Sequence, residues 1–112
     1  MFCLIILIMR EVIPTVFAMN KGEFDERLAK LVKISKKIQI DFMDGKFVDG
    51  RGVELRDVPN LRKYRSEFEA HLMVRNPEEW FEELKEKGFK KVIFHYESIR
   101  DFGSISRIRL YR

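Results

Sequence analysis

Side chains that can act as acids, bases or metal ligands interrupt or follow short apolar segments in this sequence of 112 residues. Asp41 lies within the apolar segment from Ile38 to Met43, where a solvent-facing carboxylate is not expected. Burial disfavours the charged form of a carboxylate, and this can prepare it to act as a general base. The alternative is that Asp41 caps backbone N–H groups of the turn that follows at Asp44. The sequence leaves both interpretations open.

The chain has two histidines, His71 and His95, and each falls toward the end of a predicted strand. Together with Asp41 they supply ligand types of a divalent metal site. Ligands at strand ends have no characteristic spacing, however, and a lone histidine on a strand is more often a hydrogen-bonded structural residue. By residue type alone, Met43 and Met73 are interpreted as core-filling side chains.

These side chains are positioned by strands that alternate with helices. Apolar, β-branched segments predict strands over residues 12–17, 38–42, 68–74 and 91–96. Helical periodicity, together with proline and glycine signals, predicts helices over residues 23–35, 58–64 and 77–87. Turn residues predict a turn over 20–22 and a long loop over 44–56, and Asn76 is expected to cap the last helix. The alternation predicts an α/β fold of parallel βαβ units.

Parallel βαβ units close either as a doubly wound sheet or as part of a (β/α) barrel. The sequence has no glycine-rich phosphate-binding fingerprint, which disfavours a doubly wound nucleotide-binding domain. A complete TIM barrel takes roughly 250 residues, so the four predicted strands would form about half of one. We expect a single domain over residues 1–112, with an apolar N-terminal extension at 1–9 and a basic tail at 99–112.

Composition and charge exclude several classes of protein. Hydrophobic residues make up 46% and charged residues 36%, which excludes a disordered chain and a membrane protein. The single cysteine, Cys3, excludes an internal disulfide framework and predicts a cytoplasmic protein. The net charge is +4, and the basic tail contributes four arginines and one aspartate. A diffuse nucleic-acid surface is therefore not indicated.

The N-terminal extension reads MFCLIILIM, which is shorter than the roughly 20 apolar residues of a membrane span. It has no basic residue before its apolar core and no small-residue cleavage site after it, so a secretory signal is disfavoured. We interpret it as a buried strand or as sequence upstream of a start at Met9.

Four segments carry a family resemblance. Residues 40–48, IDFMDGKFV, resemble the second-strand motif of ribulose-phosphate 3-epimerases, and residues 70–78, AHLMVRNPE, resemble the third-strand motif. Residues 92–97 and 13–16 are similar to the fourth and first strands of that family. The resemblance implies the N-terminal half of a (β/α)8 barrel. It also implies an isomerase that interconverts ribulose 5-phosphate and xylulose 5-phosphate.

The resemblance implies roles for individual residues. Asp41 matches the first acid/base aspartate, which is also a metal ligand, and His71 matches a metal-binding histidine at the substrate. Met43 and Met73 match methionines that line the site, and Thr15 stands at a substrate-contacting position. The implied cofactor is a divalent metal, commonly zinc, and the implied ligand is a sugar phosphate.

The sequence also departs from the family pattern. Gln39 stands where the family has a histidine ligand, and a neutral amide is a poor zinc ligand. The second acid/base aspartate and the phosphate-binding loops of the family lie on later strands. We therefore expect an epimerase-like protein that is weakly active or inactive alone. The alternatives are a non-catalytic, oligomeric half-barrel remnant and an anion- or RNA-binding scaffold.

Half of a barrel leaves two open strand edges and one uncovered sheet face. We expect the uncovered face to carry Val16, Ile40, Phe42, Leu72, Val74 and Phe94. Leaving several hundred Å² of apolar surface in water forfeits several kcal/mol at roughly 25 cal/mol per Å². The sequence therefore predicts a homodimer or a higher homo-oligomer.

Overall fold

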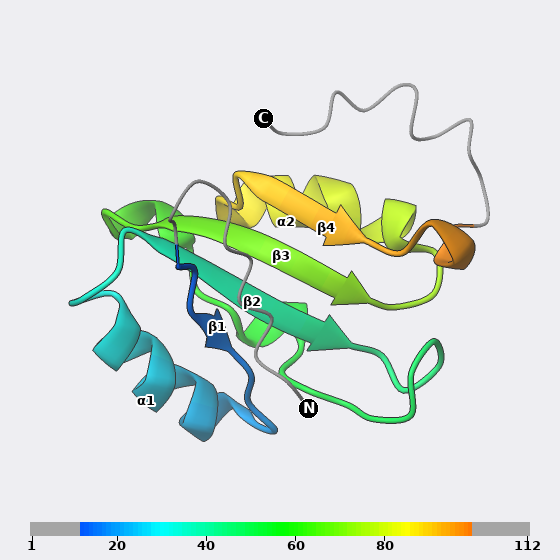
Figure 1. Cartoon of the computed structure of the whole chain (residues 1–112), viewed down its shortest axis with the longest axis horizontal. Coiled ribbons are helices and arrows are strands. Elements are labelled where there is room, and N and C mark those ends of the chain that lie inside the picture. Colours follow the sequence, from blue (N-terminus) through cyan, green and yellow to red (C-terminus); the bar gives the residue numbers. More distant parts are fainter. Residues whose placement is uncertain (1–11, 100–112) are drawn as a thin grey trace.

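The computed structural model describes residues 12–99, which form one parallel sheet with a layer of helices (Figure 1). The strands are β1 (Thr15–Val16), β2 (Lys37–Met43), β3 (Glu67–Met73) and β4 (Lys91–Phe94). The helices are α1 (Lys21–Leu31), α2 (Phe81–Lys87) and the short 3-10 helices η1 (Leu55–Asp57), η2 (Leu61–Lys63), η3 (Pro77–Trp80) and η4 (Tyr96–Ser98). The N-terminal extension and, apart from Ile99, the basic tail lie outside the described residues.

Each strand pairs in parallel with the next strand along the sequence, in the order β1-β2-β3-β4. Helical segments lie between consecutive strands. Every connection is therefore a crossover, as in the wall of a TIM barrel. The predicted α/β half barrel with four parallel strands is confirmed. No helix of residues 12–99 is long and apolar enough to cross a membrane.

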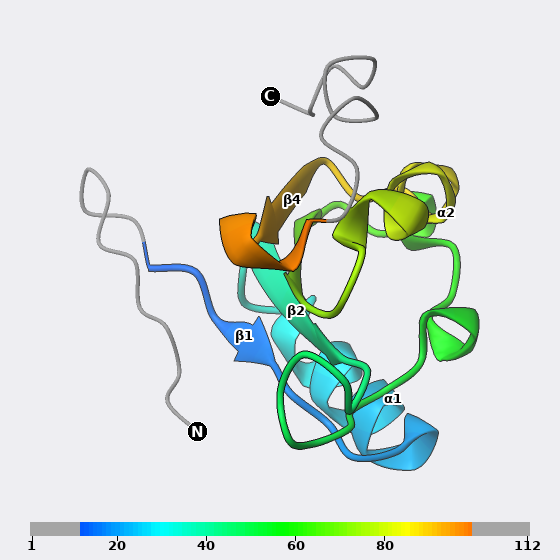
Figure 2. The ribbon, with the colours of Figure 1, turned by 90° about the vertical axis from the view of Figure 1, so that its right-hand side faces the viewer.

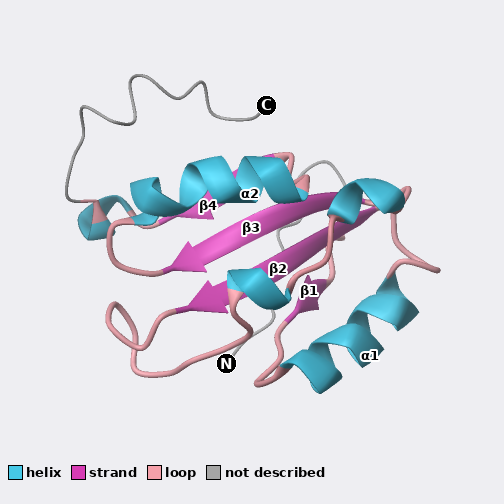
Figure 3. Ribbon diagram, turned by 180° about the vertical axis from the view of Figure 1, so that it is seen from behind, coloured by secondary structure: helices cyan, strands magenta, loops and turns pink. Residues whose placement is uncertain are grey.

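Both α-helices lie against the same face of the sheet (Figures 2 and 3). Strand side chains alternate between faces, so every second residue of β2 and β3 points toward the helices. The core on this side contains Ile38, Ile40, Phe42, Phe68, Ala70 and Leu72 from the strands and Phe24, Leu28, Phe81 and Leu84 from the helices. Phe42 packs against the rings of Trp80 and Phe89, with centroids 5.7 and 5.9 Å away.

The opposite face of the sheet, which we call the polar face, is turned toward the viewer in Figure 1. It carries the intervening residues of the same strands, among them Gln39, Asp41, Met43, Glu69, His71 and Met73. The prediction that apolar residues line this face is wrong. Of the six residues named for it, Phe94 packs against the helix-covered core, and the other five are at most 1% exposed within that core: Val16, Ile40, Phe42, Leu72 and Val74. The apolar sides of the helices need apolar partners, so alternation leaves the polar residues on the other face.

Helix α1 begins where a turn is predicted. The Asn20 side chain accepts a hydrogen bond from the Glu23 N–H at 2.9 Å, which is N-cap geometry. Lys21 and Gly22 therefore belong to the first helical turn. The helix ends at Leu31, earlier than the predicted end at Ser35.

Other boundaries also differ from the predicted ones. The helix expected over 58–64 is reduced to η2, and β1 and β4 are shorter than the strands expected over 12–17 and 91–96. Asn76 occupies the predicted N-cap position before Pro77, but its backbone is left-handed (φ 53°) and its side chain makes no capping hydrogen bond. Its N–H instead donates to the carbonyl of Ser98 at 3.0 Å, a contact between distant segments.

Candidate active site

The candidate site lies on the polar face, and strand register arranges its side chains in rows. Asp41 is aligned with His71, and His71 is aligned with Ile93. One row toward the carboxyl ends of the strands, Met43 is aligned with Met73. One row toward the amino ends stand Thr15, Gln39, Glu69 and Lys91. Parallel strands thus bring together residues that are far apart in the sequence.

Asp41 is a buried carboxylate, with only 4% of the residue exposed. Its Oδ1 accepts a hydrogen bond from Gln39 Nε2 at 3.2 Å and faces His71 Nδ1 at 3.1 Å. Among the described residues, both contacts to this carboxylate fall on Oδ1. The other oxygen, Oδ2, is the one left for a reacting group.

Asp44, rather than Asp41, caps the turn after β2. Its carboxylate accepts hydrogen bonds from the backbone N–H groups of Lys46, Phe47 and Arg75 at 2.9, 3.1 and 3.0 Å. Burial raises the pKa of the Asp44 carboxyl, but the backbone donors, Arg75 first, lower it, and the net pKa lies below the ordinary value of 3.8. Because Arg75 follows β3, Asp44 ties the carboxyl ends of β2 and β3 together.

His71 connects Asp41 to the end of β4. Its Nε2 lies 3.2 Å from Nε2 of His95, and the two ring centroids are 5.4 Å apart. His95 also packs against the ring of Phe47 at 5.2 Å, and its Nδ1 lies 3.9 Å from the carboxylate of Glu97. A continuous line of polar contacts therefore runs from Asp41 to Glu97 across three elements.

Thr15, Met43 and Met73 share the polar face with Asp41 and His71. Thr15 Oγ1 is buried and has no hydrogen-bond partner within residues 12–99. The two methionines stand side by side in register, one row beyond Asp41 toward the carboxyl ends of the strands. The structure thus brings all five residues that the sequence predicts for the site to one face.

Glu69 is absent from the set predicted from the sequence. It is 7% exposed, and its Oε1 lies 3.9 Å from Lys91 Nζ. The spacing of Glu67, Glu69 and His71 by two residues is the signal that places Glu69 on the face of His71. The polar face therefore holds two buried carboxylates: Asp41, which has a histidine beside it, and Glu69, which has a lysine beside it.

The donors around Asp41 do not fit a catalytic zinc ion. Within the described residues, no three His, Cys, Asp or Glu side chains are grouped as metal ligands. Gln39 directs its amide N–H to Asp41, and both ring nitrogens of His71 face hydrogen-bond partners. A catalytic zinc takes three good protein ligands, whereas Asp41 and His71 supply two at the predicted position. The polar groups of Gln39, Asp41 and His71 are instead in hydrogen-bond contact with one another.

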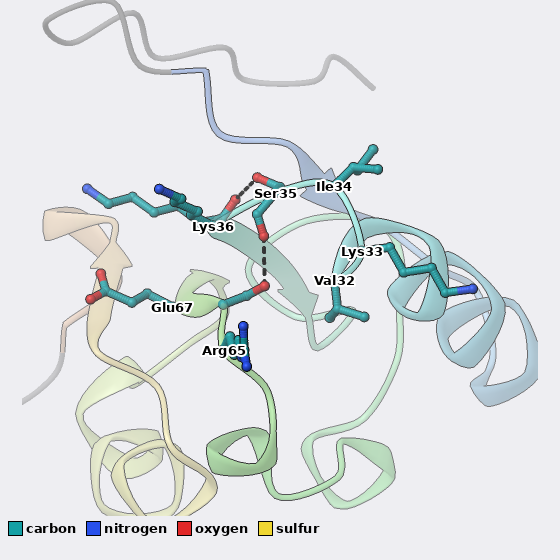
Figure 4. Close-up of a pocket in the computed structure, with 9 residues that line it drawn as sticks. Val32, Lys33, Ile34, Ser35, Lys36, Arg65 and Glu67 are labelled. Carbon is teal, nitrogen blue, oxygen red and sulfur yellow. Dashed lines mark hydrogen bonds between the residues drawn. The ribbon is translucent and has the colours of Figure 1, made fainter.

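Two cavities border the sheet at opposite ends. A cavity of about 350 Å³ lies at the carboxyl end of β2, where Met43, Asp44 and Trp80 are among its lining residues. A larger one of about 570 Å³ lies at the amino end, between residues 32–37 and 65–67 (Figure 4). Lys33 and Lys36 leave it in opposite directions, so these two cations do not converge on one ligand. Of the five predicted site residues, only Met43 lines the smaller cavity, and neither of these two cavities is lined by Asp41 or His71.

A parallel sheet whose helices all lie on one face has the layering of a TIM-barrel wall, and here the other face carries polar side chains. The chain belongs to the Ribulose-phosphate 3 epimerase family, whose sequence model matches residues 11–110. The resemblance of the strand motifs to this family is confirmed.

Individual relatives agree with this assignment. The chain is 27% identical over 93 residues to the cytoplasmic isoform of ribulose-phosphate 3-epimerase from Oryza sativa subsp. japonica, covering 81% of this chain and 41% of that protein. It is 25% identical over 97 residues to the ribulose-phosphate 3-epimerase of Schizosaccharomyces pombe, covering 82% and 42%. With the Eremothecium gossypii enzyme the identity is 32% over 76 residues, covering 57% and 32%. The chain thus spans about two fifths or less of the length of these curated relatives.

Proposed function

We propose that this chain provides part of the active site of a ribulose-phosphate 3-epimerase, with Asp41 as the acid/base residue on one side of the substrate. The observation that carries the proposal is the geometry of Asp41. It is a buried carboxylate whose described hydrogen bonds fall on Oδ1, so Oδ2 is the oxygen that accepts the proton. The relatives' names supply the substrate, a ribulose phosphate, which we take to be the 5-phosphate.

In the proposed reaction, Asp41 Oδ2 removes the proton from carbon 3 of ribulose 5-phosphate. The electron pair of the broken C–H bond moves into the neighbouring carbonyl and gives an enediolate. Return of the proton from Asp41 to the same side regenerates the substrate. Inversion to xylulose 5-phosphate needs a second acid that delivers a proton from the opposite side.

The other residues of the polar face are proposed to hold the substrate. Thr15 Oγ1, which is buried without a described partner, offers one hydrogen bond. Met43 and Met73 offer a polarizable apolar wall beside the planar intermediate. His71 faces Asp41 Oδ1 and so keeps the carboxylate oriented toward carbon 3.

The isolated chain is proposed to exchange this proton without inverting the carbon. All four described strands belong to one sheet, so their side chains approach a substrate from one side only. Abstraction and return on that side need only Asp41. We therefore expect no measurable 3-epimerase activity from this chain alone.

The test is solvent exchange at carbon 3. In deuterated water, the wild-type chain should replace the carbon 3 proton of ribulose 5-phosphate at least about 100-fold faster than Asp41→Asn, as followed by proton NMR. A coupled assay for xylulose 5-phosphate is run on the same samples. Equal exchange in both proteins contradicts the role of Asp41. Formation of xylulose 5-phosphate that is lost in Asp41→Asn contradicts one-sided chemistry.

We further propose a cytoplasmic homodimer or higher homo-oligomer. Within residues 12–99, the outer strands β1 and β4 each have one neighbouring strand, and open edges are templates for pairing. Closed two-fold assembly is the default for soluble oligomers. Light scattering coupled to size exclusion at micromolar concentration should give at least twice the mass of one chain. A monomer with a cooperative melt contradicts this.

The second candidate is a non-catalytic half barrel. The observation that favours it is Gln39, whose amide donates to Asp41 where the family has a histidine ligand. This candidate predicts that the wild-type chain and Asp41→Asn exchange the carbon 3 proton equally slowly. The deuterium experiment therefore separates the two functions.

A further inference from the structure

The cavity at the carboxyl end of β2, which we call the loop cavity, lies beside the loop over residues 44–56. Its volume of about 350 Å³ is at the lower end of the range for small-molecule sites, roughly 300–1,000 Å³. Met43 of the polar face lines it, and so does Trp80, which packs against Phe42 on the helix-covered face. The loop cavity therefore lies across the end of β2, next to the candidate site but separate from Asp41.

Three of the charged side chains that line the loop cavity already have partners. The Asp44 carboxylate accepts hydrogen bonds from three backbone N–H groups. Arg56 Nε lies 2.6 Å from the Glu54 carboxylate. These charges are therefore compensated within the chain.

Lys46 and Arg51 are the cations of the lining that lack such partners. Within residues 12–99, neither side chain forms an ion pair or a hydrogen bond. Both side chains are exposed, so a ligand can reach them. Glu83 is an acidic lining residue that is likewise unpaired in the part of the chain that the structure describes, but two cations outnumber it. The uncompensated charge at the loop cavity is therefore positive.

The backbones of both cations are tied to Asp44. The Lys46 N–H donates to Asp44 Oδ1 at 2.9 Å, and Arg51 pairs with Asp44 in an antiparallel bridge. The side chain of Arg51 also lies against Gly45, where a Cβ would be 3.2 Å from Cγ and from Nε of Arg51. Gly45 has φ 75°, a conformation that glycine adopts without a steric penalty. The loop thus brings the two cations to one cavity in the absence of a ligand, which lowers the cost of binding.

We propose that the loop cavity binds the phosphate group of a small phosphate monoester, with Arg51 and Lys46 as its cationic ligands. Two cations match the charge of about −2 that a phosphate monoester carries at neutral pH. A guanidinium presents paired N–H donors to two phosphate oxygens, and an ammonium adds a compact positive charge. The cavity at the amino end of the sheet lacks this arrangement, because Lys33 and Lys36 leave it in opposite directions (Figure 4).

This site is additional to the phosphate-binding loops that the family resemblance implies, because those loops lie on later strands. Two sources share the proposed chemistry, the phosphate of the proposed substrate and free inorganic phosphate. Neither source requires Asp41 for its contact with Arg51 and Lys46. Binding at the loop cavity can therefore be measured without turnover.

The experiment is a titration of the full chain with inorganic phosphate and, separately, with ribulose 5-phosphate, at fixed ionic strength. Calorimetry measures the dissociation constant, and the fluorescence of Trp80, the single tryptophan of the chain, should change as the ligand enters the loop cavity. We expect saturable binding of at least one probe. Arg51→Gln should weaken it at least about tenfold, because hydrogen bonds from a charged donor are lost. Lys46→Gln should weaken it about threefold, because an exposed point charge contributes less.

Two further variants control for charge. Lys33→Gln removes the same charge from an exposed side chain at the other cavity, and it should leave the dissociation constant unchanged. Arg51→Lys keeps the charge but loses the paired donors, so its loss of affinity should lie between those of wild type and Arg51→Gln.

The proposal is overturned if neither probe binds. It is also overturned if Lys33→Gln weakens binding as much as Arg51→Gln, since binding would then be unspecific attraction to a basic chain. Binding of inorganic phosphate that depends on Arg51 supports a site for the free ion. Binding of ribulose 5-phosphate alone, again dependent on Arg51, supports a site for the phosphate of the substrate.

The deuterium experiment with Asp41→Asn reports separately on the proposed function. Exchange at carbon 3 that depends on Asp41, without binding that depends on Arg51, removes the phosphate site and leaves the function. The reverse result removes the function and leaves the phosphate site.

Discussion

The two faces of the same strands are built on different principles. In β2, Ile38, Ile40 and Phe42 are fully buried beneath the helices. One residue away, Gln39 and Asp41 are nearly as buried, yet they lie among hydrogen-bond partners. A period of two therefore lets one short strand supply both the packing of the fold and the chemistry of the site.

Burial has opposite consequences on the two faces. On the helix-covered face, burial of apolar side chains stabilises the fold directly, by roughly 25 cal/mol per Å² of apolar surface. On the polar face it costs free energy unless each donor meets an acceptor. Gln39, Asp41 and His71 meet this condition through one another. Thr15 Oγ1 does not meet it within residues 12–99, and for this reason the proposed function gives it a hydrogen bond to the substrate.

The largest difference between the faces is expected for neighbouring truncations in β2. Phe42→Ala should lower the free energy of unfolding by about 3–5 kcal/mol, because the ring is 0% exposed and packs against Trp80 and Phe89. Met43→Ala is the matched control and should cost about 1 kcal/mol, because Met43 is only half-buried. Urea unfolding of both variants at one protein concentration measures the difference. Equal losses of unfolding free energy in the two variants would mean that the polar face is packed as tightly as the helix-covered face.

The fold could be predicted from the sequence, because alternation and turn residues are local signals, and the five residues that the strand motifs predict for the site all lie on one face. The face on which Phe42 lies was predicted wrongly, since a TIM-barrel interior is ordinarily filled by bulky apolar side chains. Here the interior side carries Gln39, Asp41 and His71 instead. The register of β2 with β3 and β3 with β4 decides these contacts, and no local pattern reveals register.

The missing side-chain hydrogen bond of the Asn76 cap has a similar cause. Asparagine followed by proline is a strong local signal for a helix start, and η3 does begin at Pro77. The N–H of Asn76 is bound to the carbonyl of Ser98, and the Asn76 backbone is left-handed. Contacts between distant segments also create the His71–His95 pair, which the sequence separates by 24 positions. Contacts between distant segments could therefore not be predicted from local sequence patterns.

A metal-binding variant would sharpen the description of the polar face. Gln39→His replaces an amide donor by an imidazole and, with Asp41 and His71, gives three good zinc ligands. We expect weak or no zinc binding by the wild type and at least about tenfold tighter binding by Gln39→His, measured by titration calorimetry. Gln39→Ala is the control, because it removes the amide without adding a ligand. Stoichiometric, tight zinc in purified wild-type protein would contradict the expectation.

The smallest effect is expected at Asp44, which belongs to neither face and joins the ends of β2 and β3. Its backbone donors lower the pKa of the folded carboxyl below the ordinary value of 3.8. The stabilisation is therefore fully present above pH 3.8, and it is lost as the pH falls through the folded pKa. Asp44→Asn has no group to titrate there, so its loss of stability should be evident at neutral pH and shrink in acid.

Urea unfolding of wild type and Asp44→Asn at neutral pH and below pH 3.8 measures this difference. If the two proteins differ in free energy of unfolding by the same amount at both pH values, the charge of Asp44 contributes nothing to stability. Only the shape of its side chain would then matter.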